Sequence, residues 1–320
     1  MKPLLLLSLL FFFSACSKQS EILRLVIAAE NGILAIADAG GTLLWQHPIN
    51  QVHDLQLLEN GNILVNNGWR KIMELDLAGN KVWEYDSSKT EGYNGKKIEI
   101  HAFQRLANGN TMVAESGISR IVEVDVQGEL VSSIPLQVAK PHPHTDTRLV
   151  RKLENGDYLV SHEGEERVAR YNSSGEVVWN FQVPLFGKAK AKGHGPEAYG
   201  AKTFSAIVLE NGNYLIATGN GHSVLQVTPD KEVVWHLSQN EIPGVTLAWV
   251  TTLQELSNGN FVIGNCHAGP DNPQIVEINR AKELIWSWKN VTDFPNNGLS
   301  NSLVVEGQQA KRLAERISAL

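Results

Sequence analysis

Short apolar runs separated by tight polar turns recur along most of the chain, and the stretch from Leu58 to Tyr85 shows the unit most clearly. Asn60-Gly61 lies between the apolar runs DLQLL and ILV, and this dipeptide favours a hairpin turn because both residues tolerate a positive φ angle. The turn DLAG at 76–79 separates KIMEL from KVWEY in the same way. The pattern therefore predicts four short antiparallel strands, A to D, joined by two tight turns and a looser B–C loop.

The same unit repeats along the chain in two independent registers. Asn-Gly turns between strands A and B begin at positions 60, 108, 155, 211 and 258. Turns between strands C and D place Asp, Asn or Thr at positions 38, 76, 125, 172, 228 and 279. Seven residues after these six positions stand Trp45, Trp83, Ser132, Trp179, Trp235 and Trp286. Five tryptophans in six equivalent places indicate six homologous units, or blades.

The A–B turns count five units and the C–D turns count six, and the additional unit lies near the N-terminus. Residues 24–29, 33–37 and 42–46 supply strands B, C and D of a blade that has no strand A. The segment SLVVE at 302–306 resembles the other A strands, so we expect the last strand to complete the first blade and close the ring. The predicted fold is all-β, a six-bladed β-propeller over residues 22–306, followed by a short amphipathic helix in 307–320. The alternative is an open β array, which would need polar caps at both ends.

Composition and charge narrow the possible partners. The chain has 320 residues and a formal net charge of −6, with no basic run beyond short lysine pairs. Nucleic acid is therefore excluded as a partner, because phosphate binding depends on clustered lysine and arginine. The 27 glycines and 8 tryptophans suit a turn-rich all-β domain, and a closed ring is expected to be a monomer.

The N-terminus resembles a bacterial lipoprotein signal. Lys2 precedes an apolar run at 4–13, too short to span a bilayer, and Ser14-Ala15-Cys16 follows. The resemblance implies a signal peptide in residues 1–15, lipidation of Cys16, and a tether in residues 16–21. With Ser17 after the cysteine, it further implies a lipid anchor in the outer membrane, with the protein facing the periplasm. An ordinary cleaved secretory signal is the alternative.

Loop lengths distinguish the two faces of the predicted propeller. The A–B and C–D turns are short and uniform, whereas the B–C loops and the D–A connections are long and irregular, up to the connection at 186–200. Both irregular sets lie on one face of a four-stranded blade. Because variable loops on a rigid frame carry binding and chemistry, we expect the functional site on this face, at the mouth of the central channel.

Eight of the ten histidines fall on the irregular face. Three precede or begin a strand A, and these are His53, His101 and His144. Three lie in B–C loops, and these are His162, His222 and His267. A histidine at such a position can also hydrogen-bond a neighbouring blade or simply face solvent, so a structural role is the alternative for each. Together they predict a polar, histidine-rich pocket.

Other side chains on this face complete the candidate site. Arg148 and Arg70 can hold an anion, and Trp69 can stack on a sugar or an aryl ring. Asp146 is expected to orient His144. Converging imidazoles would suit zinc or copper, but the one HxH motif, His142-Pro143-His144, contains a proline, so no motif supports a divalent metal. Cys266 and His267 are adjacent in sequence, which is poor geometry for a nucleophile and its base.

Two motifs carry a resemblance to known families. HDLQLLENGNIL at 53–64 resembles the inner strand and turn of arylsulfotransferase-like six-bladed propellers, and the D-x-x-G-x-x-x-W register at 38–45 and 76–83 resembles the tryptophan repeat of PQQ-like quinoproteins. The first resemblance implies a channel histidine as a transient sulfuryl acceptor, with His53, His101, His144 and Arg148 as the candidates. The second makes PQQ a candidate cofactor, although no cofactor motif supports it.

These observations lead to two hypotheses of function. The first is a cell-envelope propeller whose channel mouth binds a small anionic or carbohydrate-like ligand, or a protein partner. The second is an arylsulfotransferase-like or hydrolytic enzyme that uses a channel histidine as nucleophile or base.

Overall fold

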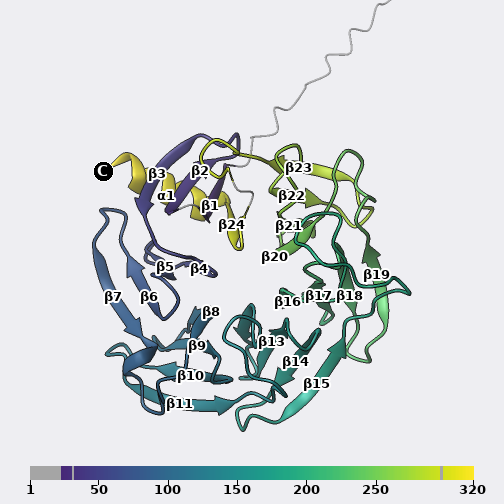
Figure 1. The fold of residues 1–320 in the computed structure, drawn as a ribbon. Helices are drawn as coiled ribbons and strands as arrows, with labels where there is room; N and C mark the ends of the chain where they lie inside the picture. Colours follow the sequence, from purple (N-terminus) through teal and green to yellow (C-terminus); the bar gives the residue numbers. More distant parts are fainter. Residues whose placement is uncertain (1–22, 31, 296–297) are drawn as a thin grey trace, which may run out of the picture.

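Six four-stranded antiparallel sheets surround a central axis in the computed structural model (Figure 1). The structure describes residues 23–30, 32–295 and 298–320. The predicted signal peptide, the tether and Cys16 lie outside these residues. The sheets are the blades of a six-bladed β-propeller, so the predicted fold class is confirmed.

Blades 1 to 3 follow one another around the ring, and each is given from its innermost strand outward. Blade 1 consists of β24 (Ser302–Glu306), β1 (Arg24–Glu30), β2 (Ile33–Asp38) and β3 (Leu43–Pro48). Blade 2 consists of β4 (Leu55–Leu57), β5 (Ile63–Asn66), β6 (Lys71–Leu75) and β7 (Lys81–Asp86), followed by the short 3-10 helix η1 (Ser87–Lys89). Blade 3 consists of β8 (Glu99–Arg105), β9 (Thr111–Ser116), β10 (Arg120–Val124) and β11 (Leu130–Pro135).

Blades 4 to 6 complete the circle with the same strand order. Blade 4 consists of β12 (Val150–Lys152), β13 (Tyr158–His162), β14 (Arg167–Tyr171) and β15 (Val177–Gln182). Blade 5 consists of β16 (Ser205–Val208), β17 (Tyr214–Ala217), β18 (Val224–Val227) and β19 (Val233–Leu237). Blade 6 consists of β20 (Trp249–Glu255), β21 (Phe261–Cys266), β22 (Ile275–Ile278) and β23 (Leu284–Trp288).

The last strand of the chain closes the ring by pairing with the first. β24 lies antiparallel to β1, with Arg24 opposite Glu306 and Ala28 opposite Ser302. Arg24 also ties this blade to its neighbour, because its Nη2 lies 2.6 Å from Glu277 Oε2 on β22 and 2.5 Å from Glu306 Oε1. The predicted closure by a C-terminal strand is therefore confirmed.

The C–D turns share one conformation, which ends each β-ladder with a bulge. In the first, Gly41 N donates to Asp38 O and Asp38 N donates to Thr42 O. The fourth turn residue has a positive φ in every blade, and it is glycine in blades 1 to 4 but Lys231 (φ 72°) in blade 5 and Lys282 (φ 66°) in blade 6. This conformation directs the chain into strand D at the same angle each time.

Indole groups on strand D connect each of several blades to the next one. Trp45 Nε1 donates to Leu77 O at 2.8 Å, and Trp83 Nε1 donates to Val126 O at 3.0 Å, each acceptor lying in the C–D turn of the following blade. Trp179, Trp235 and Trp288 make similar bonds from blades 4, 5 and 6. Blade 3 has Ser132 at the position of Trp45 and therefore has no indole there.

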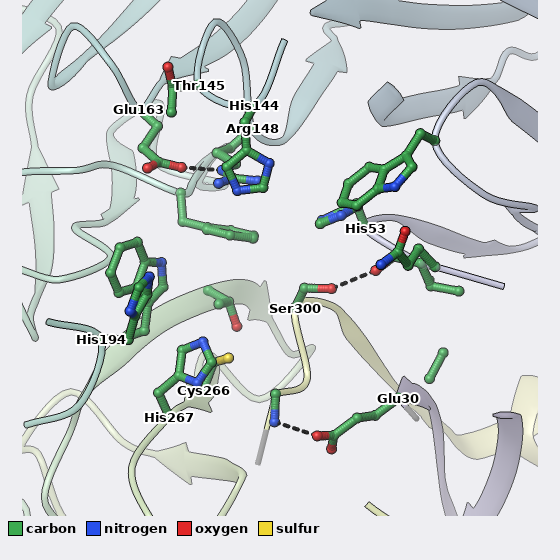
Figure 2. A pocket seen from close by; sticks show the side chains of 18 of the residues that line it. Glu30, His53, His144, Thr145, Arg148, Glu163, His194, Cys266, His267 and Ser300 are labelled. Atoms are coloured by element: carbon green, nitrogen blue, oxygen red, sulfur yellow. Dashed lines mark hydrogen bonds and ion pairs between the residues drawn. The ribbon is translucent and has the colours of Figure 1, made fainter. Parts of the chain in front are cut away.

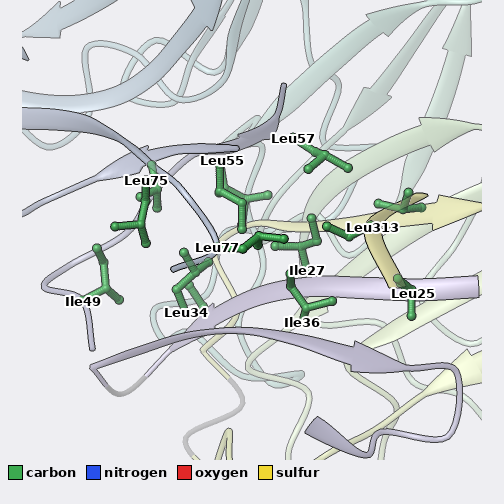
Figure 3. Packing of buried hydrophobic residues seen from close by; sticks show 14 of the residues in the cluster. Leu25, Ile27, Leu34, Ile36, Ile49, Leu55, Leu57, Leu75, Leu77 and Leu313 are labelled. Carbon is green, nitrogen blue, oxygen red and sulfur yellow. The ribbon is translucent and has the colours of Figure 1, made fainter. Parts of the chain in front are cut away.

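The hydrophobic core is divided into clusters that lie between neighbouring blades. Figure 3 shows the cluster between blades 1 and 2, where Leu34 and Ile36 meet Leu55 and Leu75. The C-terminal helix α1 (Gly307–Ser318) packs against this cluster through Ala310 and Leu313. Within the described part of the chain no helix has the length and apolar character needed to cross a membrane.

Candidate functional site

A cavity of about 770 Å³ opens at the irregular end of the central channel (Figure 2). Its walls come from B–C loops and from the segments that lead into strands A, so all of them lie on the face that the loop lengths singled out. The lining side chains used below are His53, Trp69, His144, Arg148, Glu163, His194, Lys202, Phe204, Trp249 and His267.

Three histidines gather beside Trp69, of which His53 and His144 line the cavity and His101 is buried behind them. The ring centroids of His53 and Trp69 are 4.8 Å apart and stacked. His101 lies edge-on to His53 at 4.7 Å, and His144 lies edge-on to His101 at 5.4 Å. We call His53, Trp69, His101, His144 and the adjacent Glu99 the Trp69 cluster. The structure thus brings together the three histidines that the sequence placed at the inner strands.

Glu99 joins two of these imidazoles through a single carboxylate oxygen. Glu99 Oε2 lies 2.7 Å from His144 Nδ1 and 3.3 Å from His101 Nε2. Its other oxygen, Oε1, lies 2.6 Å from Lys97 Nζ. Burial alone would raise the pKa of Glu99, but the neighbouring His101, Lys97 and His144 side chains outweigh it and lower that pKa well below its ordinary value. Glu99 is therefore a buried anion behind His144, outside the lining of the cavity.

Asp146 does not orient His144, in contrast to the prediction. Its Oδ2 accepts hydrogen bonds from Gly117 N at 2.8 Å and from Ser119 Oγ at 2.7 Å, and its Oδ1 accepts one from His142 N. These bonds shape the connection between blades 3 and 4. The carboxylate that orients His144 is Glu99, which approaches from the neighbouring blade.

Both inner histidines of the cluster are neutral at physiological pH. Burial, with further contributions from His101 and Arg148, lowers the pKa of His53 well below its ordinary value. Burial also lowers the pKa of His101 to about 4. His101 Nδ1 donates to Thr147 O at 2.9 Å, so the lone pair of the neutral ring lies on Nε2. Unprotonated imidazoles of this kind can accept a proton or bind a metal ion.

A buried charge group lies on the next part of the wall. Arg148 Nε donates to Glu163 Oε2, and Lys202 Nζ lies 3.2 Å from Glu163 Oε1. Burial alone would raise the pKa of Glu163, but Arg148 and Lys202 lower it. Arg148 is 5% exposed, its guanidinium lies 5.4 Å from the centroid of Phe204, and its two Nη atoms have no hydrogen-bond partner among the described residues. Two cations around one carboxylate leave a net positive charge beside the cavity.

A second aromatic wall faces the Trp69 cluster across the cavity (Figure 2). His194 stacks on Trp249 with centroids 5.3 Å apart, and His267 lies edge-on to His194 at 5.5 Å. We call these three residues the Trp249 cluster. Cys266 lines the cavity here but is buried, and burial raises the pKa of its thiol. A thiol in this state is a poor nucleophile, as its position beside His267 in the sequence had indicated.

Three of the predicted binding residues do not line the cavity. His162 is fully buried, with Nδ1 donating to Asp146 O at 2.7 Å and Nε2 accepting from Tyr171 Oη at 2.9 Å. Both ring nitrogens of His222 lie against carbonyl oxygens, those of Ala248 and Ala198. Arg70 is exposed. The two histidines therefore have the structural role that was their alternative, and Arg70 is not among the residues that line the cavity.

The sequence did not single out several residues that the structure places in the site. Glu99, Lys202, Phe204 and Trp249 are the main ones. Trp249 and Phe204 lie just before or at the start of a strand A, the same place that drew attention to His53, so that register was the signal available for them. Glu99 begins β8 and meets His144 across 45 residues of chain, and no short motif records such a contact.

Comparisons with known proteins show the fold and no family. No protein-family model matches the chain, and neither does any curated protein sequence. Among solved structures, a protein of unknown function from Bacteroides caccae is 22% identical with a TM-score of 0.72, covering 89% of this chain and 99% of that one. A streptogramin B lyase is 13% identical with a TM-score of 0.56, covering 86% and 87%.

A third match adds a ligand-bound propeller. A catalytically inactive variant of virginiamycin B lyase from Staphylococcus aureus, crystallised with quinupristin, is 10% identical with a TM-score of 0.55, covering 86% and 87%. The chain thus shares the β-propeller fold with lyases and with a protein of unknown function. The resemblance to quinoprotein and arylsulfotransferase-like repeats stays a hypothesis.

Proposed function

We propose that the protein is a cell-envelope β-propeller that binds a small molecule with an anionic group and a flat or sugar ring in its central cavity. The observation that carries the proposal is Arg148, a buried guanidinium whose two Nη atoms have no partner among the described residues and whose side chain lines a cavity of about 770 Å³. That volume suits a ligand of ordinary small-molecule size.

Charge supports an anionic group on the ligand. Glu163 neutralises one of the two cations around it, so Arg148 and Lys202 together present excess positive charge. A guanidinium with two free nitrogens donates to a carboxylate, sulfate or phosphate in a bidentate manner. Within a partly closed cavity such a contact is stronger than on an open surface, because less water competes for it.

The two tryptophans support a ring on the same ligand. Trp69 and Trp249 line opposite sides of the cavity, each stacked on a histidine. Indole faces pack against aryl rings and against the apolar faces of sugars. A protein loop that inserts an acidic and an aromatic side chain is the alternative occupant, and lipidation of Cys16 would place either interaction at a membrane surface.

Titration with an anionic aryl probe tests the proposal. We expect 4-nitrophenyl sulfate to bind the purified full-length chain and to quench tryptophan fluorescence, while the uncharged 4-nitrobenzyl alcohol binds at least about tenfold more weakly. Arg148→Gln should weaken the binding of the sulfate by about tenfold or more, since a charge-assisted hydrogen bond contributes roughly 1.5–3 kcal/mol.

Arg70→Gln is the matched control, because it removes an equally charged side chain from an exposed loop of the same face. It should leave the dissociation constant unchanged. Equal affinity for the charged and uncharged probes, or an unchanged affinity of Arg148→Gln in a variant that folds normally, would overturn the proposal. Binding of neither probe would overturn it as well.

The pair of Glu99 and His144 favours a second candidate function, an enzyme that transfers or hydrolyses a group. A carboxylate that accepts from His144 Nδ1 at 2.7 Å fixes the ring and leaves Nε2 as the basic nitrogen, an arrangement typical of general bases and nucleophiles. Release of 4-nitrophenol from the same sulfate probe measures this activity. We expect His144→Ala to abolish any turnover without abolishing probe binding. A complete lack of turnover by the wild type, with this and other aryl esters, would leave binding as the function.

A further inference from the structure

We infer that Glu99, His101 and His144 form a binding site for a divalent first-row transition metal, with zinc as the ion to test. The three side chains offer one carboxylate oxygen and two imidazole nitrogens that all lie within 4.8 Å of one another. No other group of three His, Cys, Asp or Glu side chains comes this close in residues 23–30, 32–295 and 298–320. This inference goes beyond the proposed function and does not depend on it.

The burial and the contacts of His101 are the first argument for a cation at this site. Its ring is 1% exposed, and Nδ1 is fixed as a donor by Thr147 O. Nε2 is buried and has no hydrogen-bond partner among the described residues, yet it lies 3.3 Å from an oxygen of the Glu99 anion. A metal ion between Nε2 and the Glu99 carboxylate would give both buried groups a partner at once.

The contact of Nδ1 with a backbone carbonyl is itself typical of a metal ligand. Metal-binding histidines almost always donate their second nitrogen to a carbonyl or a carboxylate, which fixes the tautomer and directs the other lone pair at the ion. Thr147 O performs this role for His101 at 2.9 Å. This hydrogen bond to the backbone therefore fixes the orientation of Nε2 independently of an ion.

Distances among the three side chains suit a small divalent ion after a modest adjustment. Zinc binds nitrogen at about 2.0–2.1 Å, which separates tetrahedral ligand atoms by roughly 3.3 Å. Glu99 Oε2 and His101 Nε2 already have this separation. His144 Nδ1 lies closer, at 2.7 Å from Oε2, because it donates a proton there. Its side chain is 46% exposed, so it has room to move when the ion replaces that proton.

The ligand set and its location favour a site with an open coordination position. Two histidines and one carboxylate are the ligands of several catalytic zinc sites and of non-haem iron sites, in which exogenous molecules occupy the remaining positions. His144 lines the cavity, so an ion bound to it would be reachable from there. The charge of Lys97, which contacts the other oxygen of Glu99, is screened because its side chain is 68% exposed.

Zinc titration of the full-length chain tests the site directly. Protein stripped with EDTA and dialysed should bind one equivalent of zinc in calorimetry and in competition with a chromophoric chelator. One equivalent of cobalt(II) should give the visible absorption of a nitrogen- and oxygen-ligated ion. His144→Ala should weaken zinc binding by roughly 100-fold or more, because it removes one of three protein ligands.

Two variants keep the test decisive. His194→Ala removes an exposed imidazole from the opposite wall and should leave zinc affinity within about twofold, which separates this site from general histidine binding. Glu99→Gln and His101→Gln probe the buried ligands, and the thermal unfolding of each in EDTA shows whether it folds. Absence of stoichiometric zinc binding in folded wild type, or unchanged affinity in His144→Ala, overturns the inference.

The outcome is independent of the ligand experiment. Binding of 4-nitrophenyl sulfate is measured on EDTA-treated protein, and zinc binding is measured without the sulfate. Zinc binding without sulfate binding sustains the metal site and refutes the proposed ligand, whereas the converse refutes the metal site alone.

Discussion

His162 shows how the surroundings of a histidine decide its role. It ends a strand on the same face as His144, but both of its nitrogens are engaged, by Asp146 O and by Tyr171 Oη. Burial lowers its pKa to about 4. Protonation would place a charge in a buried site close to Arg167 and would break the hydrogen bond that Nε2 accepts.

The stability of the protein should therefore fall in mild acid. The unfolded chain binds a proton at His162 below about pH 6.5, whereas the folded state resists it down to about pH 4. The stabilisation is thus complete above pH 6.5 and is lost progressively as the pH falls toward 4. Over that interval this residue alone should lower the free energy of unfolding by about 3 kcal/mol, measured by urea denaturation at several pH values.

His162→Gln should reduce the steepness of this decline, although it lowers stability at neutral pH. His47→Gln makes the same chemical change at a half-exposed position and serves as the control. Identical pH dependence in the wild type and in His162→Gln would show that His162 does not resist protonation.

The residues of the site were predictable to the extent that they occupy repeated positions. His53, His101 and Arg148 each stand seven residues before the Asn-Gly turn of their blade, so the periodicity of the turns reveals their place, and His144 lies one turn of chain upstream of Arg148. The same argument predicted His162 and His222 as binding residues, although neither lines the cavity. Sequence position determines the face of the propeller on which a residue lies, but not whether its side chain points to the channel or packs between blades. Glu99 was missed because its partner His144 belongs to the next blade.

At the scale of the elements, the C–D turn is the part of the fold that the sequence specifies most fully. The backbone hydrogen bonds that define it are local, and the fourth residue needs a positive φ, so glycine at that position is informative. Lys231 adopts φ 72° in the same turn, and an L-residue in this region is strained.

Lys231→Gly should therefore raise the stability of the protein by about 0.5–1 kcal/mol, since relief of strain exceeds the added freedom of the unfolded chain. The matched variant is Gly128→Ala, at φ 85° in blade 3, where a Cβ atom would meet nothing within 4 Å. It should lower stability by about 1 kcal/mol through backbone strain alone. Thermal unfolding measures both, and a destabilised Lys231→Gly would contradict the argument.

At the scale of the whole molecule, the ring depends on a pairing between its two ends. Pairing patterns along the chain predicted this closure because the surplus strands at one end matched the missing strand at the other. The arrangement of cavity side chains followed less directly, since it depends on the angle between neighbouring blades. That angle is set by packing between clusters such as the one that joins Leu34 to Leu55.

Removal of residues 302–320 should open the ring. It takes away β24 and leaves β1 as an unpaired edge, which invites association with other chains. Light scattering after gel filtration should show self-association, and unfolding should lose its cooperativity. Removal of 307–320 is the control, because it deletes only α1 and the packing of Leu313, so that variant should stay monomeric with a lower melting temperature. A monomeric, cooperatively unfolding 1–301 chain would contradict the role assigned to closure.

Strand D of blade 3 has no indole, so the contact between blades 3 and 4 lacks a hydrogen bond that the other pairs of neighbouring blades have. Ser132 leaves the contact between blades 3 and 4 without the bond that Trp45 and Trp83 provide elsewhere. Glu99 and His101 belong to blade 3, while His144 lies on the segment leading into blade 4, so the Trp69 cluster spans this joint. Local opening there would separate the two halves of the site, and a bound molecule or ion that contacts both would oppose it. Occupancy of the site should therefore slow amide hydrogen exchange in the strands of blades 3 and 4. Binding in the channel would then be coupled to local opening of the ring.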